Sequence, residues 1–220
     1  MGLWGTSADS TSNKPKWCTT DTNSDYAKKD VFANNQGWVR RAGTAANGND
    51  NTAAQEEVLV AIGDLAGASS TTGLKAPTIS SCRFIVGTTA NTDFTANDAN
   101  AQIDVEVTYD EEVTVNTSGG TPSLVIANND ASGGGYGNLT LTYLASESTA
   151  NSLRFRKTSA GIGNTDVLTI GGSNIVLNSG TITDTADGST AASLAFGTVG
   201  ASKTVTVSYT HLTLPTKASV

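Results

Sequence analysis

The stretch Ala101–Val115, AQIDVEVTYDEEVTV, alternates apolar and polar residues almost without interruption. Side chains of a β-strand point alternately to its two faces. The apolar set is Ile103, Val105, Val107 and Tyr109, and the polar set is Gln102, Asp104, Glu106 and Thr108. The alternation therefore predicts a strand of an antiparallel sheet, with its apolar face in a core and its polar face toward solvent.

Other segments with strand character lie before and after this stretch, separated by Gly, Asn, Asp and Ser residues that favour turns. They are residues 78–87, 121–128, 138–145, 152–157, 167–172 and 175–184. Short strands at regular spacing are typical of two packed antiparallel sheets. The sequence therefore predicts an all-β protein, with an antiparallel β-sandwich over residues 77–206.

The first part of the chain differs in composition from the predicted sandwich. Residues 1–66 contain all three tryptophans and one apolar segment, residues 56–67, that is short, β-branched and ended by glycine. These features predict a small, partly irregular module with one strand. Residues 67–76, GASSTTGLKA, are rich in Gly, Ser and Thr and precede Pro77, so they predict a linker.

Composition excludes several classes of function. The chain carries 20 acidic and 13 basic residues, a formal charge of −7, which argues against nucleic acid as a partner. No segment approaches the ~20 consecutive apolar residues that a membrane-spanning helix needs, so membrane insertion is not expected. Cys18 and Cys82 match no redox or zinc-binding spacing and predict two unpaired thiols.

Three segments of the predicted sandwich carry a family resemblance. They read DVEVTYDEEVTVNTSGGTPSLVIAN, LTYLASESTANSLRF and LTIGGSNIVLNSGTITDTADGS. Their order is similar to the bacterial Ig-like repeats of large surface adhesins, which implies an Ig-like antiparallel β-sandwich. Two places depart from the family pattern, the basic segment RFRKTSAGIGNTD and the final turn at Asp187 and Gly188.

The N-terminal region carries a second resemblance. It contains MGLWGTSADSTSNKPKW, then GWVRRAGTAANGND, then EEVLVAIGDLAG. This series resembles the start of small virion structural proteins of tailed bacteriophages that infect marine cyanobacteria. The resemblance implies that residues 1–66 form a virion-attachment module that carries the Ig-like domain outward.

The segment Val207–Thr216, VSYTHLTLPT, contains His211, the single histidine of the chain. It resembles the in-frame translation of a transposase-type sequencing adaptor, so residues 207–220 are expected to be adaptor-derived and the natural sandwich to be truncated near residue 206. A genuine last strand is the alternative. Without His211, catalytic Ser-His-Asp and Cys-His arrangements lack their general base.

Asp110, Glu111 and Glu112 could in principle act as catalytic carboxylates. Alternation places Asp110 and Glu112 on one face and Glu111 on the other, whereas a glycosidase requires two carboxylates across one cleft. We therefore expect a solvated acidic strand end and no catalytic residues.

Calcium is the one cofactor that the residue types suggest, since Asp and Asn supply hard oxygen ligands. Adhesin-type Ig domains often hold calcium at such positions, although Asp and Asn are also common turn residues. The candidate ligands, at loops and strand ends, are Asn97, Asp98, Asn100, Asp104, Asp184 and Asp187.

The N-terminal tryptophans and arginines predict an interface. Tryptophan and arginine are enriched at binding hot spots, and the module is small for burying three indole rings alone. A small core within the module and a nucleic-acid clamp are the alternatives. The candidate interface residues are Trp4, Trp17, Trp38, Arg40 and Arg41.

Together these features predict a non-enzymatic virion structural or decoration protein, assembled in the host cytoplasm. Its expected partners are other virion proteins, with host-surface glycans and further copies of the chain as candidates. A calcium-stiffened adhesin fragment at a bacterial cell surface is the alternative. A carbohydrate-acting enzyme on a β-sandwich is a third hypothesis.

Overall fold

The computed structural model describes residues 14–15, 17–20, 27–41, 55–67, 74–86, 89–90, 93–95, 102–158, 161–200 and 203–208. Nearly all of its regular structure is strand, which confirms the predicted all-β fold class. The described helices are two 3₁₀ turns, η1 (Lys28–Asp30) and η3 (Ala145–Glu147). Within the described ranges, no helix is long and apolar enough to cross a membrane.

The strands form three sheets. The first three strands are β1 (Val31–Asn34), β2 (Gly37–Arg40) and β3 (Glu57–Ala61). The next six are β4 (Ile79–Val86), β5 (Thr89–Ala90), β6 (Asp93–Thr95), β7 (Ile103–Tyr109), β8 (Val113–Asn116) and β9 (Ser123–Asn128). The last five are β10 (Leu139–Tyr143), β11 (Ser152–Lys157), β12 (Val167–Ile170), β13 (Thr181–Asp184) and β14 (Lys203–Ser208).

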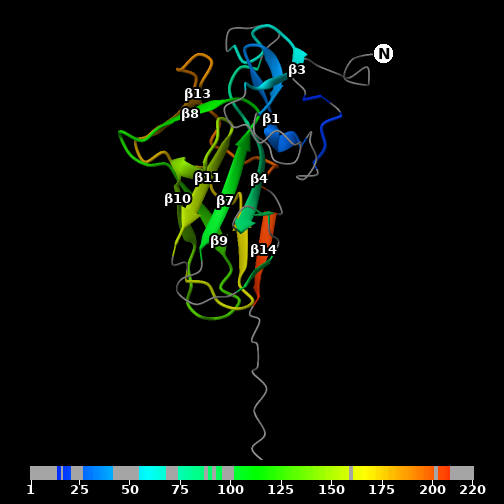
Figure 1. The fold of residues 1–220 in the computed structure, drawn as a ribbon. Coiled ribbons are helices and arrows are strands. Elements are labelled where there is room, and N and C mark those ends of the chain that lie inside the picture. Colours follow the sequence, from blue (N-terminus) through cyan, green and yellow to red (C-terminus); the bar gives the residue numbers. More distant parts are fainter. Residues whose placement is uncertain are drawn as a thin grey trace, which may run out of the picture.

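One nine-stranded sheet forms the body of the molecule, in the order β5-β4-β7-β11-β10-β9-β12-β14-β6. It bends so that β4, β7, β11 and β10 form one layer and β9, β12 and β14 lie behind them (Figure 1). Side chains of both layers join one hydrophobic core, including Val105, Phe155, Ile126, Leu168 and Val205. The fold is therefore sandwich-like, with two layers that are parts of one continuous sheet.

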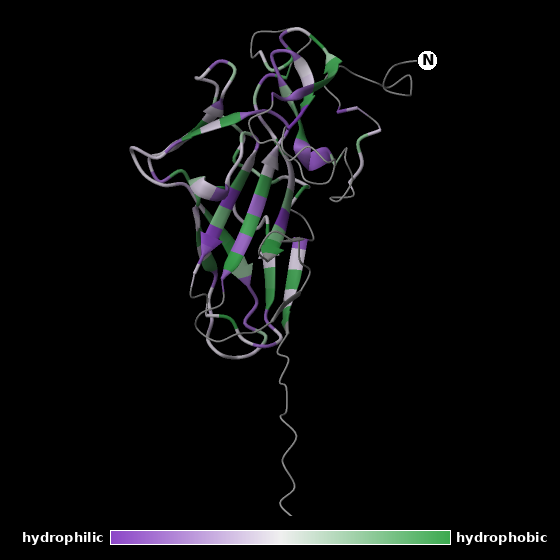
Figure 2. Cartoon of the chain, viewed as in Figure 1, coloured by the Kyte–Doolittle hydropathy of each residue, from purple (hydrophilic) through white to green (hydrophobic). Residues whose placement is uncertain are grey.

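The alternation along β7 sets the inner face of the first layer. Ile103, Val105, Val107 and Tyr109 are all fully buried in the core, as the pattern predicts. β7 pairs on one side with β4 and on the other with β11, so that Phe84 and Phe155 both lie opposite Val105. Figure 2 shows the resulting alternation of hydrophobic and hydrophilic residues along these strands.

The prediction that the polar face of β7 is solvated is wrong. Asp104 and Thr108 are each only 1% exposed: Asp104 pairs with Arg154 and Arg156 of β11, and the Thr108 hydroxyl shares a hydrogen bond with the Ser152 hydroxyl. The stretch 101–115 is also not one strand. β7 ends at Tyr109, the chain bends at Asp110, and β8 leaves the main sheet to pair with β13 in a two-stranded sheet.

The N-terminal module is a three-stranded antiparallel sheet, β1-β2-β3, which includes the predicted strand within residues 56–67. Gly37, with φ of 131°, begins β2 where a side chain would collide with the backbone of Val60 and Ile62. Trp38, Val31, Cys18 and Leu65 form a second, small core in this module.

The last described strand, β14, pairs with β12 on one side and, in parallel, with β6 on the other. Its side chains Val205 and Val207 are both 1% exposed. The strand therefore includes Val207 and Ser208, the first two residues of the segment that resembles an adaptor. His211 lies outside the described residues.

Replacing Phe155 by alanine tests the central position of β11 in the core. Phe155 is fully buried, and its ring meets that of Tyr143 edge to face at 6.1 Å. We expect Phe155→Ala to lower the free energy of unfolding by about 3–5 kcal/mol because it leaves a cavity. The exposed Thr140 on the neighbouring strand is the control. Thr140→Ala should change the free energy of unfolding by no more than about 0.5 kcal/mol. Urea unfolding measures both, and equal effects would contradict the assigned packing.

Candidate functional site

The joint between the N-terminal module and the sandwich is the most elaborate polar region of the described structure. We define the joint as the contacts of residues 27–41 with the turn Asp110–Glu112 and with Asn151. Its backbone link is a hydrogen bond of 2.8 Å from the Ala33 N–H to the Asp110 carbonyl, within a parallel bridge between Ala33 and Glu111. The edge strand β1 thereby extends directly onto the end of β7.

Asn151 connects the two modules through its side chain and is fully buried. Its amide nitrogen donates to the carbonyl of Lys29 in one module and to that of Tyr109 in the other, at 3.2 Å each. Its amide oxygen accepts a hydrogen bond of 2.7 Å from the Arg41 guanidinium. Arg41 also forms an ion pair with Asp30, at 3.8 Å. A buried amide with all these bonds fixes one relative position of the two modules.

A cavity of about 280 Å³ lies beside these contacts. One wall is the β1–β2 turn, Asn34–Gln36, with Ala33 and Ala66. The opposite wall consists of Glu112 and residues 184–186, at the end of β13. The cavity is thus formed by both modules, and its charged groups are acidic.

Glu111 is the most unusual residue of the joint. It is fully buried, and neither of its carboxylate oxygens has a hydrogen-bond partner among the described residues. Burial, followed by the negative charges of Asp110, Asp184 and Asp187, raises the pKa of Glu111 to about 8. Glu111 therefore holds a proton at neutral pH.

The expectation of a solvated acidic strand end is wrong for Glu111. Glu112 and Asp184 belong to the same group, and burial raises the pKa of each, with neighbouring acids adding to the shift. One oxygen of Asp184 accepts from the Ala186 N–H at 2.7 Å, whereas the other is buried without a partner in the described structure. The N-terminal module covers this turn, and sequence patterns within the sandwich could not show that.

Of the candidate calcium ligands, the structure places Asp184 and Asp187 together in the turn at the end of β13, and Asp104 separately in β7. Asn97, Asp98 and Asn100 lie outside the described residues. Asp187 is exposed and caps its own turn, accepting from the backbone of Ser189 and Thr190 at 2.8 Å each. A hydrogen bond from the Thr190 hydroxyl, followed by these backbone bonds, lowers the pKa of Asp187.

Among the described residues, the carboxylates of the joint do not form a group placed to hold a metal ion. Ca²⁺ takes about six to eight oxygen ligands, commonly from several carboxylates. Within the described ranges, no group of three or more His, Cys, Asp or Glu side chains is placed to hold a metal ion. Burial and neighbouring acidic groups raise the pKa of both Glu111 and Asp184, which shifts each carboxyl group toward its neutral form.

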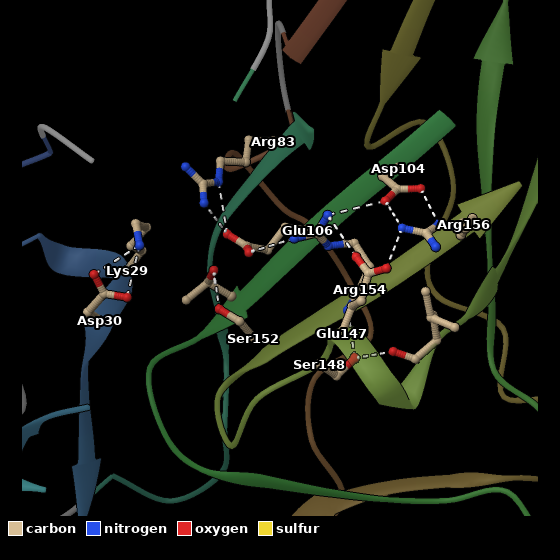
Figure 3. Close-up of polar contacts among 12 residues, drawn as sticks. Lys29, Asp30, Arg83, Asp104, Glu106, Glu147, Ser148, Ser152, Arg154 and Arg156 are labelled. Atoms are coloured by element: carbon tan, nitrogen blue, oxygen red, sulfur yellow. Dashed lines mark hydrogen bonds and ion pairs between the residues drawn. The ribbon is translucent and has the colours of Figure 1, made fainter. Parts of the chain in front are cut away.

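Asp104 belongs to a network of ion pairs on the outer face of the first layer (Figure 3). Its carboxylate contacts Arg154 at 3.2 Å and Arg156 at 2.6 Å. Glu106, the next outward residue of β7, pairs with Arg83 of β4 at 2.7 Å, and Glu147 of η3 pairs with Arg156 at 2.7 Å. We call these six residues the outer ion-pair network. The basic segment that departs from the Ig-like pattern supplies its two central arginines.

The candidate interface residues have different surroundings. Trp4 lies outside the described residues. Trp38 is 1% exposed in the small core of its own module, Arg40 pairs with Glu57 across β2 and β3, and Arg41 lies in the joint. Among the described members of this set, Trp17 has a large exposed side chain, at 47% exposure.

The chain matches no family model, and no curated protein or solved structure is significantly similar to it.

Both cysteines, Cys18 and Cys82, are unpaired, as their spacing predicts, and both are buried. Burial raises the pKa of the Cys82 thiol to about 11, so this thiol is not activated as a nucleophile. The arrangement of the joint serves to hold two modules together in a fixed orientation.

Replacing Glu111 by glutamine tests its protonation. A glutamate with a pKa of about 8 in the folded protein and about 4.5 in the unfolded chain stabilises the fold fully below pH 4.5. This stability is lost as the pH rises toward 8, because the unfolded chain releases the proton first. Glu111→Gln should therefore flatten the decline of melting temperature between pH 5 and pH 8.5.

The exposed Thr140 provides the control for this measurement. Thr140→Ala changes no titratable group and should leave the slope of melting temperature against pH as it is in the unmodified chain. The slope is the relevant quantity, because a buried glutamine amide also changes the absolute stability. Parallel curves for Glu111→Gln and the unmodified chain would show that Glu111 is ionised throughout.

Arg41 and Arg40 form a matched pair for testing the joint. Arg41→Ala removes the guanidinium contact with Asn151 and should loosen the modules at a cost of about 2–3 kcal/mol. Arg40→Ala removes an ion pair within one module and should cost about 1 kcal/mol or less. Hydrogen exchange of the Ala33 amide reports on the joint directly. Equal protection of that amide in both variants would contradict the role of Arg41.

Proposed function

We propose that this chain is a non-enzymatic structural protein of a phage virion. The N-terminal module attaches to the particle, and the sandwich decorates its surface and adheres weakly to host-surface glycans. The observation that carries this proposal is the joint. Modules that share a backbone bridge and a buried amide clamp move as one body, which suits a domain held outward from a particle.

The exposed apolar residues of the N-terminal module support attachment through that module. Trp17 and Val58 are 47% and 43% exposed, in a module whose own core is small. Tryptophan is the residue most enriched at binding hot spots. Contact with other virion proteins would remove both side chains from water.

The two layers of the sandwich support a role that does not involve turnover of substrate. Asp104, Glu106 and Glu147 are paired with arginines in the outer ion-pair network, and Glu111 is enclosed against the N-terminal module. A carboxylate in an ion pair or in an enclosed joint cannot reach a substrate bond. This arrangement favours a rigid scaffold.

Immunogold labelling tests the proposal. Antibodies raised against the recombinant chain should label intact tailed particles purified from a lysate whose phage genome encodes it. The chain with Trp17→Ser and Val58→Ser, added to particles stripped of the native protein, should rebind at least about tenfold more weakly than the unmodified chain. Thr140→Ala serves as the control for rebinding.

Two outcomes would contradict this proposal. Label on bacterial cells and not on particles would support a surface adhesin. Hydrolysis of glycans or peptides by the purified chain, abolished in Asp110→Asn or Glu112→Gln, would support an enzyme.

A further inference from the structure

A second cleft lies between the N-terminal module and the sandwich, on the side of β4. It has a volume of about 350 Å³ and is lined by five basic side chains: Lys14, Lys28, Lys29, Arg83 and Lys203. These residues come from three distant parts of the sequence, so folding is what brings their charges together. The five cations around this cleft contrast with the net charge of −7 of the whole chain.

Two of these cations have acidic partners. Lys29 pairs with Asp30 at 2.9 Å, and Arg83 pairs with Glu106 at 2.7 Å. Lys14 donates to the carbonyl of Lys28 at 2.9 Å, and within the described ranges no ion pair is recorded for Lys14, Lys28 or Lys203. The cleft therefore has an excess of positive charge toward a ligand.

The surroundings of Lys14 favour an anion. Burial, with the nearby charge of Lys28, lowers the pKa of Lys14 to about 8, although Asp110 and Asp30 act in the opposite direction. An ammonium group that has lost part of its hydration gains more from a bound anion than an exposed one does. Lys14 is therefore the residue of the cleft that an anionic group would stabilise most.

The remaining lining indicates what carries the anion. Thr20, Ser80 and Ser81 supply hydroxyl groups, and the described lining contains no aromatic ring. Nucleobases are commonly held by stacking on aromatic side chains, whereas sugar hydroxyls require hydrogen-bonding groups. The volume is sufficient for a ligand of one or two sugar rings and is at the lower end for ligand clefts.

We propose that this cleft binds a sulfate or phosphate ester carried on a sugar unit. The oxyanion lies among Lys14, Lys28 and Lys203, and the sugar hydroxyls face Thr20 and the serines of β4. This inference rests on the proposed function, whose glycan partner it specifies as an acidic one. Its position between the modules also means that the ligand contacts both of them.

Calorimetric titration of the full chain tests the inference, with three probes: a sulfated disaccharide, the same disaccharide without sulfate, and inorganic sulfate. The sulfated disaccharide should bind at least about tenfold more tightly than either of the others, because only it supplies both the charge and the hydroxyls. Its affinity should fall as salt is added. Inorganic sulfate binding equally well would reduce the site to a free-anion site and overturn the sugar assignment.

The variants locate the site. Lys28→Gln and Lys203→Gln should each weaken binding of the sulfated disaccharide by about 5- to 10-fold through loss of a charge-assisted contact. Lys75→Gln removes an exposed lysine that does not line the cleft and should leave the affinity unchanged. Equal affinity of all three variants would overturn the inference. Binding in solution is independent of particle labelling, so failure of one leaves the other distinguishable.

Discussion

Strand β7 has no exposed face, and this constraint determines much of the structure around it. Its inner side chains fill the core, and its outer carboxylate Asp104 is as buried as they are. A buried carboxylate without a counter-charge costs several kcal/mol, so β11 has to place arginines beside it. Arg156 lies directly opposite Asp104, and Arg154 directly opposite Glu106. A shift of one residue would turn Phe155 outward and separate these charges at the same time. The outer ion-pair network and the core therefore specify the same register.

The position of β7 also determines the joint. The strand ends at Tyr109, whose carbonyl accepts from Asn151, and the next residue accepts from the Ala33 amide. The N-terminal module is thus attached at the turn that directly follows β7, a strand buried on both faces. The cost of this arrangement is the burial of Glu111, which the fold accommodates by keeping that side chain protonated. The contribution of protonated Glu111 to this joint is complete in acid and declines as the pH rises from about 4.5 toward 8.

Sequence patterns predict the parts of this structure that depend on local alternation. The apolar face of β7 and the strands at residues 123–128, 139–143 and 152–157 follow from period-two patterns and turn residues. The hairpin of β1 and β2 was also accessible, since Asn34–Gly37 is a turn between two apolar pairs, but it was not predicted. The burial of Asp104 and Glu111 was not accessible, because it depends on arginines and on a module distant in the sequence. For the same reason the basic cleft leaves no motif in the chain, since its described lining comes from Lys14, Thr20, residues 27–29, residues 80–83 and Lys203.

The charges of the molecule are separated on two flanks of the N-terminal module. The cavity against β13 is acidic, and the cleft against β4 is basic. Charges farther apart than about 8 Å are largely screened at physiological ionic strength, so the cleft attracts an anion only at short range. Over longer distances the net negative charge repels extended polyanions such as nucleic acid. A ligand with one anionic group on an otherwise neutral sugar chain is attracted by the lysines of the cleft. It is repelled little by the net negative charge of the protein. For the proposed ligand, this combination favours a sparsely charged glycan over a densely charged polymer, although both carry oxyanions.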